Sequence, residues 1–198
     1  MAYRIIDFLD GPQLMKGESD TMLTIDDKLP SITVAVQRGG DLSGETLDLG
    51  ASNGRWKILF FWPKNFTAVC PTDIVGYGQL QKSFDERGAD LIGASTDTAP
   101  MHLAWRKSDR NLAACDFPWI ADDKCELAKA MGIHDPVEGL ARRATFIVDP
   151  DNAIQHVTVN AKIVGRNPEE ILRVLDALLT GEECPCNWVP GDEFVTPV

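Results

Sequence analysis

Residues 61–73, FWPKNFTAVCPTD, form the stretch that decides how this chain folds. The apolar run WKILFFW, residues 56–62, leads into Pro63 and predicts a strand that is buried on both faces. Pro71 then stands where the first position of a helix is expected, because proline is favoured there. The apolar residues that follow at helical spacing are Ile74, Tyr77, Leu80 and Phe84. The stretch therefore predicts a strand, a turn and a helix in direct succession.

Cys70 immediately precedes this predicted helix. Its sulfur is expected to face unpaired backbone N–H groups and the positive end of the helix dipole, and both favour a thiolate. The thiolate is the reactive form, whereas an unperturbed thiol is only about 3% ionised at pH 7. A lone cysteine in a globular protein is more often a buried structural residue. The coincidence of strand, turn, proline and helix favours the other interpretation, in which Cys70 is a nucleophile.

The same stretch carries a resemblance to a known family. Pro63, Thr67 and Cys70 fit the Pro-x-x-x-Thr-x-x-Cys signature of peroxiredoxins. Further stretches match the alkyl hydroperoxide reductase C branch of that family in the same order, namely residues 102–105 (HLAW), 138–150 (EGLARRATFIVDP) and 181–188 (GEECPCNW). The resemblance extends from about residue 22 to the end of the chain. It implies a thioredoxin-like fold and a cysteine-based peroxidase that needs no metal, haem or flavin cofactor.

Three further residues are candidates for a reaction between Cys70 and a peroxide. Thr67 can offer a hydroxyl beside the sulfur, and capping of the turn is its alternative role. Pro63 has no chemistry of its own, but its rigid backbone can shape the pocket and shield an oxidised sulfur from water. An arginine is expected to complete the site, and the resemblance assigns this role to Arg143, directly before the strand ATFIVD. The neighbouring Arg142 is expected to be a surface residue.

Two cysteines, Cys184 and Cys186, lie near the C-terminus in a stretch without periodicity, which we expect to be extended and mobile. A Cys-x-Cys pair can form half of a metal site, but zinc takes four ligands and the sequence offers no second pair. A free thiol on a mobile tail suits a resolving role, in which it condenses with a sulfenic acid to give a disulfide. The resemblance matches Cys184 to the resolving cysteine of a neighbouring subunit, and Cys186 to an addition typified by actinobacterial members. Whether Cys186 replaces Cys184 or passes the oxidation outward stays open.

Other candidate residues receive structural interpretations. Cys115 and Cys125 match no catalytic position of the family and are expected to be structural. His102 and Trp105 match a packing motif on a helix, so we expect no acid–base role for the histidine. Asp73 stands where many relatives carry glutamate. Whether Asp73 makes the hydrogen bond that is expected at this position, near the subunit contact, stays open.

Composition limits the function further. A chain of 198 residues with 44% hydrophobic and 25% charged residues is typical of one globular domain. A net charge of −11 argues against nucleic acid or an anionic membrane as a partner. The five cysteines do not resemble a disulfide framework. Asp7 and Asp10 interrupt the apolar N-terminal stretch, which argues against a signal peptide and predicts a cytoplasmic protein.

Periodicity along the rest of the chain predicts a fold class. Strands are expected at residues 32–36, 45–49, 89–95, 144–149 and 153–160, with a short strand or turn at 118–122. Helices are expected at 71–88, at 100–109, after Asp122 or Asp123, and from Asn167. Strands that alternate with helices indicate an α/β fold, with a mostly parallel but mixed sheet and helices on both faces. We expect an extension at residues 1–21, one thioredoxin-like domain at 22–180 and the tail at 181–198.

These expectations define a two-cysteine peroxidase that reduces hydrogen peroxide and alkyl hydroperoxides, with peroxynitrite as a further candidate substrate. The resemblance implies a protein reductant of the thioredoxin, AhpD-like or AhpF-like kind, and a homodimer that assembles into a ring of five dimers. A disulfide oxidoreductase of the thioredoxin kind would need Cys-x-x-Cys, and residue 67 is threonine. A peroxide sensor or holdase chaperone ring is the remaining alternative.

Overall fold

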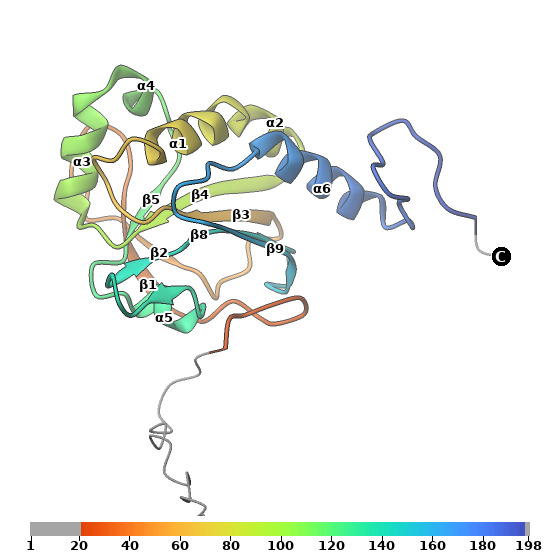
Figure 1. Cartoon of the computed structure of the whole chain (residues 1–198), viewed down its shortest axis with the longest axis horizontal. Coiled ribbons are helices and arrows are strands. Elements are labelled where there is room, and N and C mark those ends of the chain that lie inside the picture. Colours follow the sequence, from red (N-terminus) through yellow and green to blue (C-terminus); the bar gives the residue numbers. More distant parts are fainter. Residues whose placement is uncertain (1–20, 197–198) are drawn as a thin grey trace, which may run out of the picture.

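A seven-stranded mixed sheet forms the centre of the computed structural model, which describes residues 21–196 (Figure 1). Its strand order is β2-β1-β5-β4-β3-β8-β9, and a separate two-stranded hairpin pairs β6 with β7. The strands are β1 (Thr33–Gln37), β2 (Thr46–Asp48), β3 (Trp56–Phe61), β4 (Ala89–Ser95), β5 (Trp119–Ala121), β6 (His134–Asp135), β7 (Leu140–Ala141), β8 (Arg143–Val148) and β9 (Ile154–Asn160). The helices are α1 (Cys70–Gln79), α2 (Gln81–Glu86), α3 (Ala99–Ser108), α4 (Arg110–Ala113), α5 (Glu126–Ala130) and α6 (Pro168–Thr180).

The mixed α/β sheet is confirmed, and its parallel part is confined to the three central strands. β4 runs parallel to both β3 and β5, whereas every other neighbouring pair in this sheet is antiparallel. The strands expected at residues 32–36, 45–49, 89–95, 144–149 and 153–160 are present with small shifts at their ends, whereas β6 and β7 were not expected. Periodicity carries no information on the direction of neighbouring strands, and β8 and β9 join the sheet as an antiparallel pair. Parallel pairing is therefore less extensive than the alternation of elements suggested.

Two apolar clusters, one on each face of the sheet, account for the unbroken apolar sequence of β3. Ile58 and Phe60 belong to the cluster beneath α1, α2 and α6, whereas Leu59 and Phe61 belong to the cluster beneath α5. All four side chains are fully buried. Alternate residues of a strand face opposite sides, so a strand covered on both sides needs apolar residues throughout. Helices thus cover both faces, as expected.

The helix predicted to follow Cys70 and to end at Gly88 is interrupted. α1 ends at Gln79, and α2 begins after Leu80, whose φ of −96° and ψ of 2° depart from helical values. Glycine inside a helix weakens it, and α1 contains Gly76 and Gly78. A Cβ at residue 78 would lie 2.6 Å from the Cys115 sulfur, so packing requires glycine there despite its cost to the helix. The contact between residue 78 and Cys115 is tertiary, so the sequence did not show why glycine stands there.

The start of α6 follows the prediction in detail. The Asn167 side chain accepts hydrogen bonds from the backbone N–H groups of Glu169 and Glu170, at 3.1 and 3.4 Å. Pro168 occupies the first turn, and Gly181 ends the helix with a φ of +68°. These contacts satisfy terminal backbone groups and fix the position of the chain on both sides of the helix.

The antiparallel pairing of β3 with β8 determines what lies near Cys70. Phe60, near the end of β3, is paired with Thr145, near the start of β8. The loop that leaves β3 and the first residue of β8 therefore lie at the same edge of the sheet. α1 begins directly after this loop, which brings Cys70 and Arg143 together although 73 positions separate them.

Two kinds of feature, a membrane-spanning helix and a metal-binding cluster, are absent from the described residues. One expectation concerns residues outside that range. None of the helices within residues 21–196 is long and apolar enough to cross a membrane. Within the same range, no three His, Cys, Asp or Glu side chains are grouped in a way that could hold a metal ion. The extension expected at residues 1–21 lies, apart from Thr21, outside the described part of the chain.

Candidate active site

Cys70 is the first residue of α1 and is only 2% exposed. Pro71 is consequently the second helical residue, one position later than predicted. The first backbone N–H groups of a helix lack internal partners, so proline costs no hydrogen bond there. The shift places the Cys70 sulfur in the first turn itself, where the helix dipole favours a negative charge.

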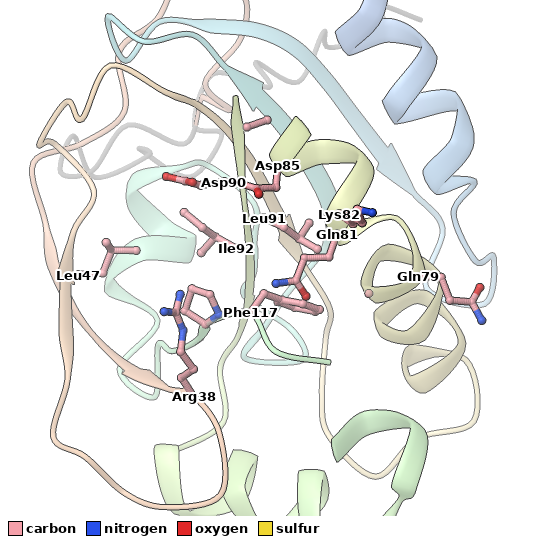
Figure 2. A pocket seen from close by; sticks show the side chains of 13 residues that line it. Arg38, Leu47, Gln79, Gln81, Lys82, Asp85, Asp90, Leu91, Ile92 and Phe117 are labelled. Atoms are coloured by element: carbon pink, nitrogen blue, oxygen red, sulfur yellow. The ribbon is translucent and has the colours of Figure 1, made fainter. Parts of the chain in front are cut away.

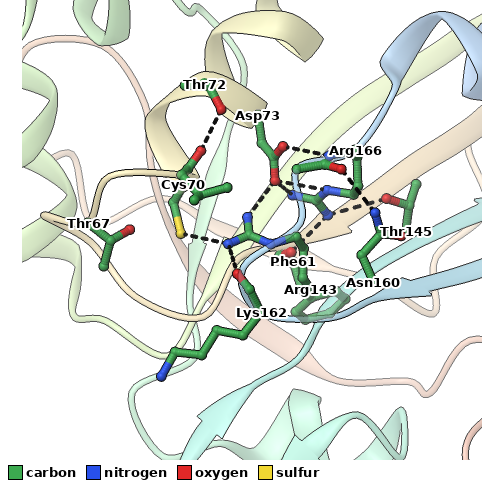
Figure 3. A network of polar contacts seen from close by, with 12 residues as sticks. Phe61, Thr67, Cys70, Thr72, Asp73, Arg143, Thr145, Asn160, Lys162 and Arg166 are labelled. Atoms are coloured by element: carbon green, nitrogen blue, oxygen red, sulfur yellow. Dashed lines mark hydrogen bonds and ion pairs between the residues drawn. The ribbon is translucent and has the colours of Figure 1, made fainter.

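Arg143 lies directly against Cys70 (Figure 3). Its Nη2 donates to the Cys70 sulfur at 3.5 Å and to the Lys162 carbonyl at 2.9 Å. The arginine is 2% exposed, so water screens this contact little. Arg142 is exposed, so of the two adjacent arginines only Arg143 is in a position to act on the sulfur.

Asp73 and Arg166 complete a buried ionic network that the sequence did not reveal. The Asp73 carboxylate accepts from Arg143 Nη1 at 2.5 Å and from Arg166 Nη2 at 2.9 Å. The side chains of Asp73, Arg143 and Arg166 are at most 2% exposed. Two guanidinium cations therefore share one carboxylate, which leaves one positive charge unmatched within the network. A thiolate at Cys70 would neutralise this charge.

Arg166 is held firmly by further contacts. Its Nη1 donates to the carbonyl oxygens of Phe61 and Ala144, each at 2.8 Å, and its guanidinium lies over the rings of Phe60 and Tyr77. Such bonds fix the planar group at the ends of β3 and β8, and Arg166 in turn orients Asp73. No local pattern marks this residue, because it lies 93 positions from Asp73.

Pro63 and Thr67 lie in the loop between β3 and α1, in different surroundings. Pro63 is buried and lines, together with Arg143, a pocket of about 420 Å³ that also contains Leu140 and Val159. Thr67 is exposed, and its hydroxyl donates to the Lys64 carbonyl at 3.2 Å. The hydroxyl of Thr67 thus caps the turn, which is the alternative role expected for it. Its oxygen still has lone pairs that can accept a further hydrogen bond.

The loop that carries Pro63 and Thr67 is anchored through the buried Asn65. The side-chain oxygen of Asn65, Oδ1, accepts a hydrogen bond from Trp62 Nε1 at 2.9 Å, and its side-chain nitrogen, Nδ2, lies 3.0 Å from His102 Nδ1. His102 Nε2 faces the Ile120 carbonyl at 3.0 Å, so it must donate and Nδ1 must accept from Asn65. A neutral histidine therefore ties the loop to α3 and β5. Burial lowers the pKa of His102 to about 4, which agrees with the predicted absence of acid–base chemistry.

Acidification is expected to destabilise the protein through His102. In the unfolded chain its pKa returns to about 6.5, so below that pH the unfolded state binds a proton that the folded state excludes. Stability is unaffected above about pH 6.5 and falls as the pH drops towards 4. Between pH 7 and pH 5 the expected loss in unfolding free energy is about 2 kcal/mol. Urea unfolding at both pH values checks this, with His102→Gln as the control. Equal pH dependence in the two proteins would contradict it.

Cys184 and Cys186 lie far along the chain from the network, in the tail after α6. Figure 1 shows this tail beyond the C-terminal end of α6, away from the start of α1. Cys186 is exposed and Cys184 half-buried, and all five cysteines of the chain are free thiols. The structure thus brings Pro63, Cys70 and Arg143 together, and it does not bring the two tail thiols to them within one chain.

The expectation of an extended tail is wrong for residues 183–195. The Val195 N–H donates to the Glu183 carbonyl at 2.9 Å, which closes these residues into a loop. Trp188, 3% exposed, stacks on Phe194 at a centroid distance of 5.9 Å. Burial of the Trp188 ring stabilises a fold that has no periodic pattern, although Phe194 itself is 44% exposed, and this is why the sequence did not reveal it.

Cys115 and Cys125 occupy the structural positions expected of them. The Cys115 sulfur lies 3.7 Å from the Ile74 carbonyl inside the core, and burial raises its pKa to about 11. Burial, and more weakly the charge of Asp122, also raise the pKa of Cys125. Both thiols therefore stay protonated near neutral pH and are poor nucleophiles.

A separate pocket of about 540 Å³ lies beside the N-terminal half of β4, between α2 and the region of β1 and β2 (Figure 2). Its two carboxylates, Asp85 and Asp90, are both paired with Arg55. The remaining polar side chains on its wall include Arg38 and Lys82. The residues that line this pocket include no cysteine, serine or threonine, so the candidate active site is the network around Cys70.

Comparison with known proteins identifies the family of this chain. The model of the AhpC/TSA family matches residues 25–157. Alkyl hydroperoxide reductase C of Mycolicibacterium smegmatis is 44% identical over 184 residues, which cover 88% of this chain and 94% of the relative. The solved structure of Mycobacterium tuberculosis AhpC is 42% identical, with a TM-score of 0.77 over 85% of this chain and 99% of that chain. The reduced 2-Cys peroxiredoxin of Plasmodium vivax is 28% identical, with a TM-score of 0.80 over 86% of this chain and 91% of that chain.

These likenesses establish the peroxiredoxin form of the thioredoxin-like fold. The family model spans more than half of the sequence, and the mycobacterial relatives align over nearly their whole length. This chain therefore belongs to the AhpC/TSA family.

Proposed function

We propose that the protein is a thiol-dependent peroxidase that reduces hydrogen peroxide and alkyl hydroperoxides with Cys70 as its nucleophile. The observation that carries the proposal is the 3.5 Å contact between Arg143 Nη2 and the Cys70 sulfur, within a buried network that has an unmatched positive charge. This arrangement stabilises a thiolate and leaves a cationic donor beside the oxygen atoms of a bound peroxide. The names of the relatives agree with this chemistry.

The first step transfers two electrons from sulfur to the peroxide. The Cys70 thiolate attacks the terminal oxygen, so an S–O bond forms while the O–O bond breaks. The departing oxygen leaves with the electron pair of the broken bond and takes up a proton, which gives water or an alcohol. Arg143 stabilises the negative charge that develops on this oxygen, and Thr67 can accept a hydrogen bond from the peroxide. Pro63 keeps water from the sulfenic acid that results.

The second step forms a disulfide with a tail cysteine. The sulfur of Cys184 or Cys186 attacks the sulfenic sulfur, an S–S bond replaces the S–O bond, and the hydroxyl leaves as water with the proton of the thiol. In Figure 1 the tail lies away from the start of α1, the helix that begins at Cys70, which supports resolution between two subunits. A dithiol protein, a thioredoxin or an AhpD-like or AhpF-like protein, then reduces the disulfide.

We propose a homodimer as the smallest active unit, and a ring of five dimers as its larger assembly. β9 is the last strand of the sheet, so its outer edge has no partner strand among the described residues. Ile163 and Val164, just after β9, are 83% and 49% exposed, and Val159 within it is 39% exposed. An open edge with apolar side chains beside it is a surface that a second copy can cover.

Single-turnover kinetics tests the function and the role of the tail thiols together. Reduced protein mixed with hydrogen peroxide is expected to show a fast change in tryptophan fluorescence as Cys70 is oxidised, followed by a slower phase as the disulfide forms. In the variant with both Cys184→Ser and Cys186→Ser, the fast phase is expected to stay and the slow phase to disappear. Steady-state turnover with a dithiol reductant should then fall at least about tenfold, because no protein disulfide forms.

The single variants rank the two thiols. If Cys184 is the main resolving residue, Cys184→Ser slows the second phase and Cys186→Ser leaves it unchanged. A second phase that survives in the double variant would contradict the assignment of resolution to the tail. Absence of any fast phase in the wild-type protein would contradict the peroxidase itself.

A further inference from the structure

The C-terminal loop, residues 183–195, is a folded unit that contains both tail thiols. Besides the bond between Val195 and Glu183, the indole N–H of Trp188 donates to the Asp192 carbonyl at 3.2 Å. The Asp192 carboxylate in turn accepts from the Val189 N–H at 3.0 Å. These contacts lie within the loop, so they give it a shape without fixing its position on the rest of the molecule.

Arg173 of α6 makes a polar contact that does fix the loop. Its Nη1 donates to the Trp188 carbonyl at 2.8 Å. Its Nε and Nη2 donate to the two oxygens of Glu170 at 2.7 and 2.8 Å, one helical turn earlier. Such a two-pronged bond holds a planar guanidinium in one orientation, so that Nη1 points at the loop.

The same guanidinium lies close to both thiols. Arg173, Cys184 and Cys186 line one pocket of about 690 Å³ between α6 and the tail. The hydrogen bond with Glu170 raises the pKa of Arg173. The residue therefore stays cationic throughout the working pH range. Its side chain is 29% exposed, so the contact is accessible to a second molecule that approaches the thiols.

We propose that Arg173 is a positioning residue for the resolving half of the peroxidase cycle, because it clamps the C-terminal loop to α6 and so presents Cys184 and Cys186 to the oxidised Cys70 of a second copy. The inference rests on the proposed function, since it concerns the thiols that resolve the sulfenic acid. Arg173 touches neither the peroxide nor Cys70, so it acts only through the loop. Disulfide formation requires the two sulfurs to meet at bonding distance, and misplacement of a reacting group by about 1 Å can slow a reaction up to about a hundredfold.

The test compares two arginines with matched surroundings. Arg173→Met removes the clamp, and Arg87→Met removes a similar ion pair to Asp176 on the same helix. The Arg87 side chain is 30% exposed, against 29% for Arg173, but it makes no described contact with the loop. The reduced variants are mixed with hydrogen peroxide and quenched in acid after timed intervals, and mass spectrometry counts the sulfenic acid and the disulfide.

Arg173→Met is expected to oxidise Cys70 at the wild-type rate and to form the disulfide about tenfold more slowly. Arg173→Lys, which can still donate to the Trp188 carbonyl, should recover part of this loss. Glu170→Gln, which loosens the orientation of the guanidinium, should slow disulfide formation by a smaller factor. A general loss of structure would instead slow both phases and would affect Arg87→Met similarly.

The outcomes separate this inference from the proposed function. If disulfide formation in Arg173→Met is as fast as in Arg87→Met, the positioning role of Arg173 is wrong, whereas the proposed peroxidase function is unaffected. If Arg173→Met slows oxidation of Cys70 as much as disulfide formation, the positioning role is likewise overturned. If Cys70→Ser still forms both products, the proposed function fails whatever Arg173 does.

Discussion

Cys70→Ser is expected to lower the rate of reaction with hydrogen peroxide at least about a thousandfold, to the level of the uncatalysed reaction. A serine hydroxyl is almost wholly un-ionised near neutral pH, and its oxygen does not give up two electrons to a peroxide as the cysteine sulfur does. The buried positive charge and Arg143 would remain, but no nucleophile would stand beside them. The measurement is stopped-flow tryptophan fluorescence of the reduced protein over a range of peroxide concentrations.

The control for this experiment is Cys125→Ser. Cys125 is half-buried, and its sulfur lies 3.6 Å from the Gly139 carbonyl, away from the ionic network. Burial raises its pKa, so it contributes little thiolate. We expect Cys125→Ser to react with peroxide at the wild-type rate. Equal rates for Cys70→Ser and the wild-type protein would overturn the assignment of the nucleophile, whichever other cysteine proved reactive.

The sequence predicted those parts of the site that depend on neighbouring residues. β3 and the start of α1 follow, to within one residue, from an apolar run, a proline and helical spacing, and these place Cys70 at the start of the helix. The start of α6 follows from Asn167 and Pro168 in the same way. Each of these signals is local, so one sequence contains all that is needed to identify it.

The parts that escaped prediction depend on residues that are distant in the chain. Arg143 was assigned through the family resemblance, because nothing in its own neighbourhood distinguishes it from Arg142. Arg166 was missed altogether, since its contacts with Phe61 and Asp73 arise only when β3, α1 and the segment before α6 meet. The folded C-terminal loop was missed for a similar reason, as it depends on the packing of Trp188.

Asp73→Asn is expected to destabilise the protein by about 3–5 kcal/mol, the usual cost of removing one partner from a buried ion pair. The substitution keeps the size and shape of the side chain but removes the carboxylate that Arg143 and Arg166 share. Two guanidinium cations would then be buried side by side without the carboxylate that pairs with both. The amide of asparagine also presents two N–H groups to partners that are donors themselves.

The control is an ion pair of the same kind at the surface. Asp85 pairs with Arg55 at 2.6 Å, but the Asp85 side chain is 74% exposed. Water and salt screen such a pair, so Asp85→Asn is expected to cost less than about 1 kcal/mol. Unfolding free energies from urea titration give both values under the same conditions. Costs that agree within about 1 kcal/mol would show that burial of the network contributes little.

Asp73→Glu separates the charge from the geometry of the network. It restores the carboxylate, so it should regain most of the stability that Asp73→Asn loses. Its extra methylene enters a site whose side chains are at most 2% exposed, so a remaining cost of about 1–3 kcal/mol is expected from overpacking. Because Asp73 orients Arg143, both variants should also slow the reaction of Cys70 with peroxide, the asparagine variant more than the glutamate variant. A glutamate variant no more stable than the asparagine variant would mean that the shape of the carboxylate site, and not its charge, holds the two arginines in place.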